Sequence, residues 1–271
     1  MNEPSQNRGP SLRFAKVSRI YGDVIAVDSL SFNIDAGSLV ALVGASGSGK
    51  TTLLKMINRL VEPSSGDIFM DDAAVIDQAA HMHRRSIGYV FQNIGLFPHM
   101  TIAQNIAIGL KLAGREEEAA SRISELLELV DLPAEYSARM PNQLSGGQQQ
   151  RVGLARALAT GPGLMLLDEA FGALDPVTRD NLGQEYRALH QRLGLTTILV
   201  THDMAEAVLL ADRILVLEAG KIVADATPAE LVSGKAGEQA ETLMAVPRGQ
   251  AERLLELGRL ELGQSNLELG A

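Results

Sequence analysis

The chain has 271 residues, a formal net charge of −9 and no cysteine. Its length accommodates one large domain, or one domain with a subdomain. The negative charge argues against a general nucleic-acid binder, because such proteins neutralise phosphates with an excess of lysine and arginine. The absence of tryptophan and the aromatic content of 4% argue further against base-stacking surfaces. Without cysteine there are no disulfides or thiolate metal sites, which is compatible with the cytosol.

The hydropathy pattern predicts a chain without membrane-spanning helices. No uninterrupted apolar run reaches roughly 18–20 residues, the length that a bilayer requires. Residues 1–11 are polar and have no apolar core, so we expect no secretory signal there.

The first third of the chain predicts mainly strands. Short apolar and polar stretches alternate before residue 36, with turn residues at 21–23, which is typical of antiparallel strands. A fully apolar run then predicts a buried strand, and the segment after it has a helical pattern. The strands are expected within residues 12–35 and at residues 39–43, 67–70 and 87–91, and the helix at residues 52–60.

The middle of the chain predicts a mostly helical insert between two parts of a sheet. Thr101 and Gln104 have the spacing of a capping box, and Gly114 is suited to end that helix. Two later apolar runs predict strands that are covered on both faces. The expected elements are a helix from residue 101, a helix at residues 116–130, strands at residues 163–168 and 196–201, a hairpin at residues 213–223, and a short helix after Pro228.

The segment after the buried strand 39–43 fits the pattern G-x-x-x-x-G-K-[ST]. Glycines let backbone N–H groups curl around an anion, and the helix that follows points its positive end at the same place. In this pattern the lysine reaches the β- and γ-phosphates and the threonine hydroxyl binds Mg²⁺. We therefore predict a nucleoside triphosphate site. Its expected residues are Gly44, Ala45, Ser46, Gly47, Ser48, Gly49, Lys50, Thr51 and Thr52.

Two carboxylates, Asp168 and Glu169, end the apolar strand 163–168. Ligands of parallel sheets bind at the carboxyl edge, where these side chains are expected. An aspartate there can hold Mg²⁺, directly or through water, and a neighbouring glutamate can deprotonate an attacking water. The phosphate loop upstream favours this interpretation over a solvated acidic turn.

Two further polar residues end predicted strands. His202 follows strand 196–201, where a lone histidine is more often structural, but its expected place beside Asp168 favours a contact with the γ-phosphate. Gln92 follows strand 87–91. Its amide is compatible with ligating Mg²⁺ or water, and the residues alone leave that role open.

A second anion-binding turn is predicted at residues 144–148, which read Leu-Ser-Gly-Gly-Gln. Ser145 is suited to cap a helix over residues 149–159, and the glycines beside it leave the helix N-terminus open to an anion. Taken alone, this pattern favours an ordinary capped helix. Because the chain also contains the phosphate loop, the sequence predicts two anion sites in one chain, which needs an explanation.

Five motifs in this order resemble those of the ATP-binding cassette ATPases, over roughly residues 12–228. The resemblance implies an α/β fold: a P-loop NTPase core with a mostly parallel sheet, an N-terminal antiparallel β subdomain and a helical signature subdomain. It places the cassette at residues 1–234, with the helical subdomain at about residues 93–160. The remaining residues 235–271 are then a short helical or disordered tail without a full regulatory domain. The motifs are residues 44–51, Gln92, residues 144–148, residues 164–169 and His202.

The resemblance also implies roles for single residues. In such proteins two cassettes pair head to tail, so that Ser145 and Gly147 of one clasp the γ-phosphate bound by the other, in an ATP-bound homodimer. Water attacks the γ-phosphate in line, with Glu169 as general base, while Lys50 and Mg²⁺ offset the developing charge. The implied catalytic residues are Glu169, His202 and Lys50, and the implied Mg²⁺ ligands are Thr51, Gln92 and Asp168. Besides the phosphate loop, the implied nucleotide contacts are Tyr21, Gln92, Ser145, Gly146, Gly147, Gln148 and Asp175, with Tyr21 stacking on adenine and residues 173–175 communicating between subunits.

Within the family, the chain is similar to the importer branch that handles glycine betaine, choline and related osmoprotectants. The similarity lies in residues 58–66, 92–102 and 246–254. It implies an ATPase on the cytoplasmic face of the cell membrane, with integral-membrane permease subunits and an extracytoplasmic binding protein as partners, and no nucleic acid. An importer ATPase for another small solute and an exporter ATPase are the alternatives.

Other readings fit the residues less well. A DNA-repair member of the family would carry a long coiled-coil insert, and a translation member would carry two cassettes. A nucleotide or sugar kinase would share the phosphate loop but would not need residues 144–148. One departure from the family pattern is Ala170, which stands where a proline usually follows the glutamate and which bears on how rigidly Glu169 is held.

Overall fold

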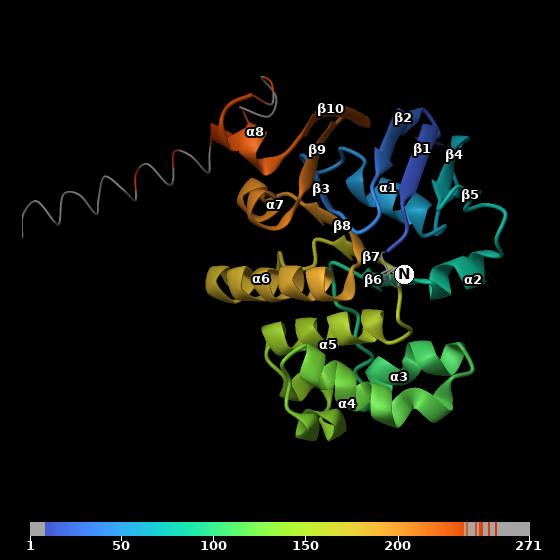
Figure 1. Cartoon of the computed structure of the whole chain (residues 1–271), viewed down its shortest axis with the longest axis vertical. Coiled ribbons are helices and arrows are strands. Elements are labelled where there is room, and N and C mark those ends of the chain that lie inside the picture. Colours follow the sequence, from blue (N-terminus) through green and yellow to red (C-terminus); the bar gives the residue numbers. More distant parts are fainter. Residues whose placement is uncertain are drawn as a thin grey trace, which may run out of the picture.

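The computed structural model describes residues 9–235, together with residues 237, 242, 244, 245, 249 and 253. Apart from these positions, the tail predicted at residues 235–271 lies outside the described residues. The elements of the described part form two sheets with helices around them (Figure 1).

The larger sheet has six strands and is mostly parallel. Its order is β10 (Lys221–Ala226), β9 (Arg213–Glu218), β3 (Leu39–Val43), β8 (Thr196–Thr201), β7 (Leu164–Asp168) and β6 (Ile87–Val90). Only β10 runs antiparallel to its neighbour among these strands. Val43 of β3 pairs with Thr201 of β8, and Asp168 of β7 pairs with Val200. The carboxyl ends of β3, β8 and β7 therefore meet at one edge of the sheet.

The smaller sheet is antiparallel and is built from the N-terminal part of the chain. Its order is β2 (Val24–Ile34), β1 (Leu12–Tyr21), β4 (Ser65–Met70) and β5 (Ala73–Ala74). The predicted fold class, a mostly parallel sheet with an N-terminal antiparallel part, is confirmed.

The helices fall into two groups in Figure 1. In the lower part of the view lie α3 (Ile102–Leu112), α4 (Ala119–Leu129) and α5 (Gly146–Leu158). Closer to the sheets lie α1 (Lys50–Ile57), α2 (Ala80–Arg85), α6 (Pro176–Leu193), α7 (Met204–Leu210) and α8 (Pro228–Val232). Within the described residues, none of these helices is both long enough and apolar enough to cross a bilayer.

Several predicted boundaries shift for local reasons. Helix α1 begins at Lys50 and ends before residue 60, because Arg59 has a φ of +51° that no right-handed helix accommodates. Helix α5 begins at Gly146, earlier than expected, because Ser145 caps it. Strand β4 begins at Ser65 and β6 ends at Val90. Residues 116–118 form a 3₁₀ turn before α4 rather than its first turn.

The hydrophobic core is divided by the six-stranded sheet. Leu39, Ala41 and Val43 of β3 pack in one cluster with residues of α3 to α8. Val40 and Leu42 point to the opposite face, into a cluster that includes α1 and the antiparallel sheet. A sheet covered on both faces explains why its central strand β3 is apolar at every position.

Candidate nucleotide site

The phosphate loop joins β3 to α1 and is closely packed from outside. A Cβ atom at Gly44 would lie 2.1 Å from the Leu217 oxygen, and one at Gly49 would lie 2.3 Å from the Ala26 oxygen. Gly49 also has a φ of +105° and offers no side-chain cap to α1. The first turn of α1 thus presents its N–H groups without a competing side chain, which suits an anion.

Lys50 is buried and folds over the loop. Its Nζ donates hydrogen bonds to the Gly44 oxygen at 2.7 Å and to the Ala45 oxygen at 2.8 Å. Burial lowers the pKa of Lys50, while the negative charges of Glu169 and Asp168 act in the opposite direction. The cation therefore lies within electrostatic reach of both carboxylates that end β7.

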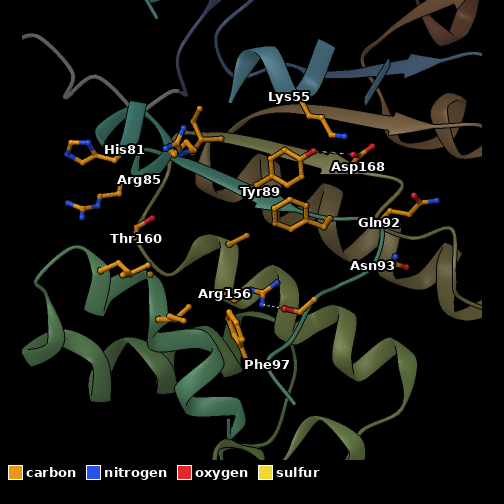
Figure 2. Close-up of a pocket in the computed structure, with 18 of the residues that line it drawn as sticks. Lys55, His81, Arg85, Tyr89, Gln92, Asn93, Phe97, Arg156, Thr160 and Asp168 are labelled. Carbon is orange, nitrogen blue, oxygen red and sulfur yellow. Dashed lines mark hydrogen bonds between the residues drawn. The ribbon is translucent and has the colours of Figure 1, made fainter. Parts of the chain in front are cut away.

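Asp168 connects the phosphate loop to β6. The Thr51 hydroxyl donates to Asp168 Oδ1 at 3.0 Å, and the Tyr89 hydroxyl donates to Oδ2 at 3.1 Å. Figure 2 shows the Tyr89 ring pointing toward Asp168. Burial, together with the charge of Asp168, raises the pKa of Tyr89, so this phenol remains a hydrogen-bond donor.

Glu169 brings together the ends of three strands. Gln92, which follows β6, donates from Nε2 to Glu169 Oε2 at 2.7 Å. His202, which follows β8, places Nδ1 3.5 Å from the same oxygen. The sequence places His202 beside Asp168 at this edge, and the contact found is with Glu169, the next residue. The sequence alone left the role of Gln92 open, and the structure places its amide in contact with the Glu169 carboxylate.

The turn at residues 145–148 lies elsewhere in the chain. Ser145 accepts a hydrogen bond from Gln148 N at 3.3 Å, and Gln148 returns one to Ser145 N at 3.0 Å, which completes a capping box. A Cβ atom at Gly147 would lie 2.8 Å from Thr178 in α6, so the turn packs against the start of that helix. Figure 1 shows α5 in the lower group of helices and α1 among the strands. The turn predicted to bind a second anion therefore lies apart from the phosphate loop of the same chain.

Two other residues predicted to contact the nucleotide, Asp175 and Tyr21, interact with neighbouring side chains or backbone of this chain. Asp175 caps α6 by accepting from Thr178 N at 3.1 Å. Hydrogen bonds from the Thr178 side chain, and then from its backbone, lower the pKa of Asp175. Tyr21 is 43% exposed at the end of β1, with the Arg19 guanidinium 4.4 Å from its ring centroid. The roles expected for these residues stay predictions.

The sequence analysis missed Tyr89 and the ion pair between Arg179 and Asp203. The Arg179 guanidinium donates to the Gly172 oxygen at 3.1 Å and to Asp203 Oδ2 at 3.3 Å. Asp203 also caps α7, directly after His202. Arg179 thus joins the segment after Glu169 to the segment after His202. No local pattern marks Arg179, because its partners lie in other segments.

The donors beside the loop suit a hard divalent cation. Thr51, Gln92 and Asp168 offer a hydroxyl, an amide and a carboxylate oxygen. Mg²⁺ is typically held by one or two carboxylates, with phosphates and waters completing its shell. No cluster of three or more His, Cys, Asp or Glu side chains that could hold a metal occurs in the described part of the chain. The donor set therefore fits Mg²⁺ that is coordinated partly by the protein and partly by the phosphates of a bound nucleotide.

A groove of about 890 Å³ opens beside this edge. Helices α2, α3 and α5 line it, together with β6 and the loop after Gln92 (Figure 2). Apolar side chains such as Phe91 and Phe97 share its surface with basic side chains such as Arg84 and Arg85.

The family described as ABC transporter matches residues 27–172. The chain belongs to this family. It is 51% identical over 239 residues to the glycine betaine/carnitine/choline transport ATP-binding protein OpuCA of Bacillus subtilis (strain 168), covering 88% of this chain and 63% of that protein. It is 46% identical over 228 residues to the glycine betaine uptake system ATP-binding protein YehX of Escherichia coli (strain K12), covering 84% of this chain and 74% of that protein.

The fold also matches a solved cassette. The dimeric structure of MJ0796, a bacterial ABC transporter cassette, aligns with a TM-score of 0.72 and 34% sequence identity, covering 80% of this chain and 98% of that chain. The resemblance read from the five motifs is therefore confirmed as family membership. The chain spans less than two thirds of the length of OpuCA, at 63%.

Proposed function

We propose that this chain is the ATP-hydrolysing subunit of an importer for quaternary amine osmoprotectants such as glycine betaine, choline and carnitine. The observation that carries the hydrolytic part is the meeting of Asp168, Glu169, Gln92 and His202 beside the phosphate loop. The names of OpuCA and YehX support the transport part.

The proposed reaction is in-line attack of water on the γ-phosphate of ATP. The phosphates lie against the N–H groups of the loop and α1, and Lys50 turns from the loop oxygens toward them. Thr51, Gln92 and Asp168 would hold Mg²⁺, which when bound offsets the charge that develops on the phosphate oxygens. Glu169 takes the proton of the attacking water, and the contacts from Gln92 and His202 orient its carboxylate.

A second copy of the chain completes the proposed site. The separation of residues 145–148 from the phosphate loop leaves this turn available to another cassette. The dimeric structure reported for MJ0796 supports a head-to-tail pair. In this pair Ser145, Gly146, Gly147 and Gln148 face the γ-phosphate of the partner, and Asp175 lies near the contact between subunits.

The membrane partners are proposed to dock on the groove beside Gln92. Its mixture of apolar and basic side chains suits a protein segment rather than a small polar solute. The chain then works at the cytoplasmic face of the membrane, with permease subunits bound directly and an extracytoplasmic binding protein bound through them.

The genes that adjoin the one for this chain provide the test. We expect a permease and a binding protein with an aromatic cage, which holds quaternary ammonium groups by cation–π attraction. Expressed together in a strain without its own osmoprotectant uptake, the set should accumulate labelled glycine betaine, choline or carnitine. The same set with Lys50→Ala should not. Accumulation of a different solute class, with none of these three taken up, would contradict the proposed cargo.

A further inference from the structure

The loop that follows Gln92 is held from one side by α5. The Arg156 guanidinium donates to the Gly95 oxygen at 2.7 Å and also to the Ile94 oxygen. Figure 2 shows Arg156 with a dashed line to this loop. Gly153, one turn earlier, gives the loop its space, because a Cβ atom there would lie 2.8 Å from Ile94 Cγ2. Two positions of α5 therefore lie against Ile94, and Arg156 also holds Gly95.

The chemistry of this contact needs arginine. In the described part of the chain, no ion pair includes Arg156, and its hydrogen bonds go to two successive carbonyl oxygens. Burial lowers the pKa of Arg156. A planar guanidinium presents two N–H groups at a fixed angle, whereas a lysine ammonium cannot reproduce that fork.

The contact stands between two parts of the proposed reaction centre. Helix α5 begins at the Ser145 turn and runs to Leu158. Gly95 is three residues after Gln92, whose amide contacts Glu169 at 2.7 Å. Ile94 and Gly95 therefore connect α5 to the residue that contacts Glu169.

We infer that Arg156 is a positioning residue for hydrolysis: it holds Gln92 against Glu169 by tying the loop at Ile94 and Gly95 to α5. The inference rests on the proposed hydrolytic function. It makes Arg156 part of the same unit as Gln92, although Arg156 touches neither Glu169 nor the phosphate loop.

The test is Arg156→Lys, which keeps the charge and removes the fork. Misplacement of a catalytic group lowers turnover steeply, so we expect kcat for ATP hydrolysis to fall by about tenfold or more. The KM for ATP should not change, because the phosphate loop is untouched. Gly153→Ala, which keeps Arg156 but pushes Ile94 away, should also lower kcat.

Arg122→Lys is the matched control. The Arg122 guanidinium donates to the Leu158 oxygen at 3.0 Å and to the Ala159 oxygen at 3.3 Å, at the end of the same helix but away from the Gln92 loop. This variant should keep kcat. The melting temperatures of the two lysine variants show whether a loss of kcat reflects loss of folding.

A double-mutant cycle identifies the route. If Arg156 acts through Gln92, Arg156→Lys should cost little further activity in a Gln92→Ala background. Two results would overturn the inference while the proposed function stands. One is that Arg156→Lys lowers kcat as much in the Gln92→Ala background as in the unmodified chain. The other is that the kcat of Arg156→Lys equals that of Arg122→Lys. If the unmodified chain does not hydrolyse ATP, the proposed function itself fails, and the inference with it.

Discussion

Glu169 occupies a backbone conformation that few residues other than glycine adopt. Its φ is +48°, in the left-handed region. Glu169 N bonds to the Val200 oxygen at 2.9 Å, and Gly172 N bonds to the Glu169 oxygen at 3.1 Å, so both sides of the residue are fixed. Ala170 and Phe171, which follow, are buried. This turn directs the carboxylate toward Gln92 and His202, and strain of this kind is common at reaction centres.

Glu169→Gln tests the proposed general base. The substitution keeps the size of the side chain and can still accept a hydrogen bond from Gln92, so the fold should be retained. Because an amide cannot take the proton from water, we expect kcat to fall by about 10²- to 10⁴-fold. A phosphate-release assay measures this, with nucleotide binding as the control. Turnover close to that of the unmodified chain would exclude Glu169 as the base.

Tyr89→Phe should change how stability depends on alkaline pH. Burial raises the pKa of Tyr89 in the folded chain, whereas in the unfolded chain a tyrosine ionises near pH 10. Above about pH 10 the folded state therefore binds more protons than the unfolded state, and the free energy of unfolding falls as pH rises.

We expect this fall to be smaller for Tyr89→Phe than for the unmodified chain. Urea unfolding from about pH 8 to about pH 11 measures it. Tyr21→Phe, at a half-exposed position, is the control. If the free energy of unfolding falls equally steeply with pH in Tyr89→Phe and in the unmodified chain, the Tyr89 phenol does not contribute to the pH dependence.

At the scale of elements, the sequence predicts segments better than it predicts contacts between them. The apolar runs that form β3, β7 and β8 carry their own signal, and so do the capping box at Thr101 and the helix cap at Ser145. The partners of Tyr89 and Arg179 carry none, because they depend on strand order and register. Placing β6 beside β7 is what brings Tyr89 to Asp168. Glu169 could be predicted as a base, but not the turn that aims it.

The buried His83, which joins α2 to α1, should make the chain less stable at acidic pH. His83 is buried and places Nε2 2.7 Å from the Ile57 oxygen, the last residue of α1. Burial lowers the pKa of His83, and the nearby charges of Arg59 and Arg84 lower it further, against the effect of the Ile57 hydrogen bond. The unfolded chain therefore takes up a proton below about pH 6.5 that the folded chain resists.

We expect the free energy of unfolding to fall as the pH drops from about 7 to about 5, and part of this fall to vanish in His83→Gln. His81→Gln, at an exposed position on the same helix, provides the comparison. Chemical denaturation at each pH gives the values. The same pH dependence in both variants would contradict the assignment to His83.

The groove beside Gln92 should couple hydrolysis to transport through Phe97. This side chain is 38% exposed, while its backbone is held by Asn105, which accepts from Phe97 N at 2.7 Å. Phe97→Asp should leave the backbone in place and put a charge in the contact with the permease, where burial is costly. We expect ATP hydrolysis to persist and uptake to fail.

Phe97→Leu, which keeps an apolar side chain, should retain uptake. Transport and ATPase assays on the same membrane vesicles give both quantities. Undiminished uptake by the Phe97→Asp variant would remove this docking assignment.

At the scale of the whole molecule, the parts of the site divide into two surfaces. The phosphate loop, Asp168, Glu169 and His202 share one sheet edge, whereas the Ser145 turn packs against the start of α6. One chain therefore presents the edge proposed to bind the nucleotide and, apart from it, the turn proposed to bind an anion. A head-to-tail pair would bring each edge to the other copy's turn and form two equivalent sites.

The mass of the Glu169→Gln variant in solution, measured by light scattering with and without ATP, tests this claim most directly. Because this variant should bind ATP without hydrolysing it, the pair should persist once formed. We predict the mass of a single chain without nucleotide and twice that mass with saturating ATP. A single-chain mass in saturating ATP, with binding confirmed in the same sample, would contradict a site shared between two copies.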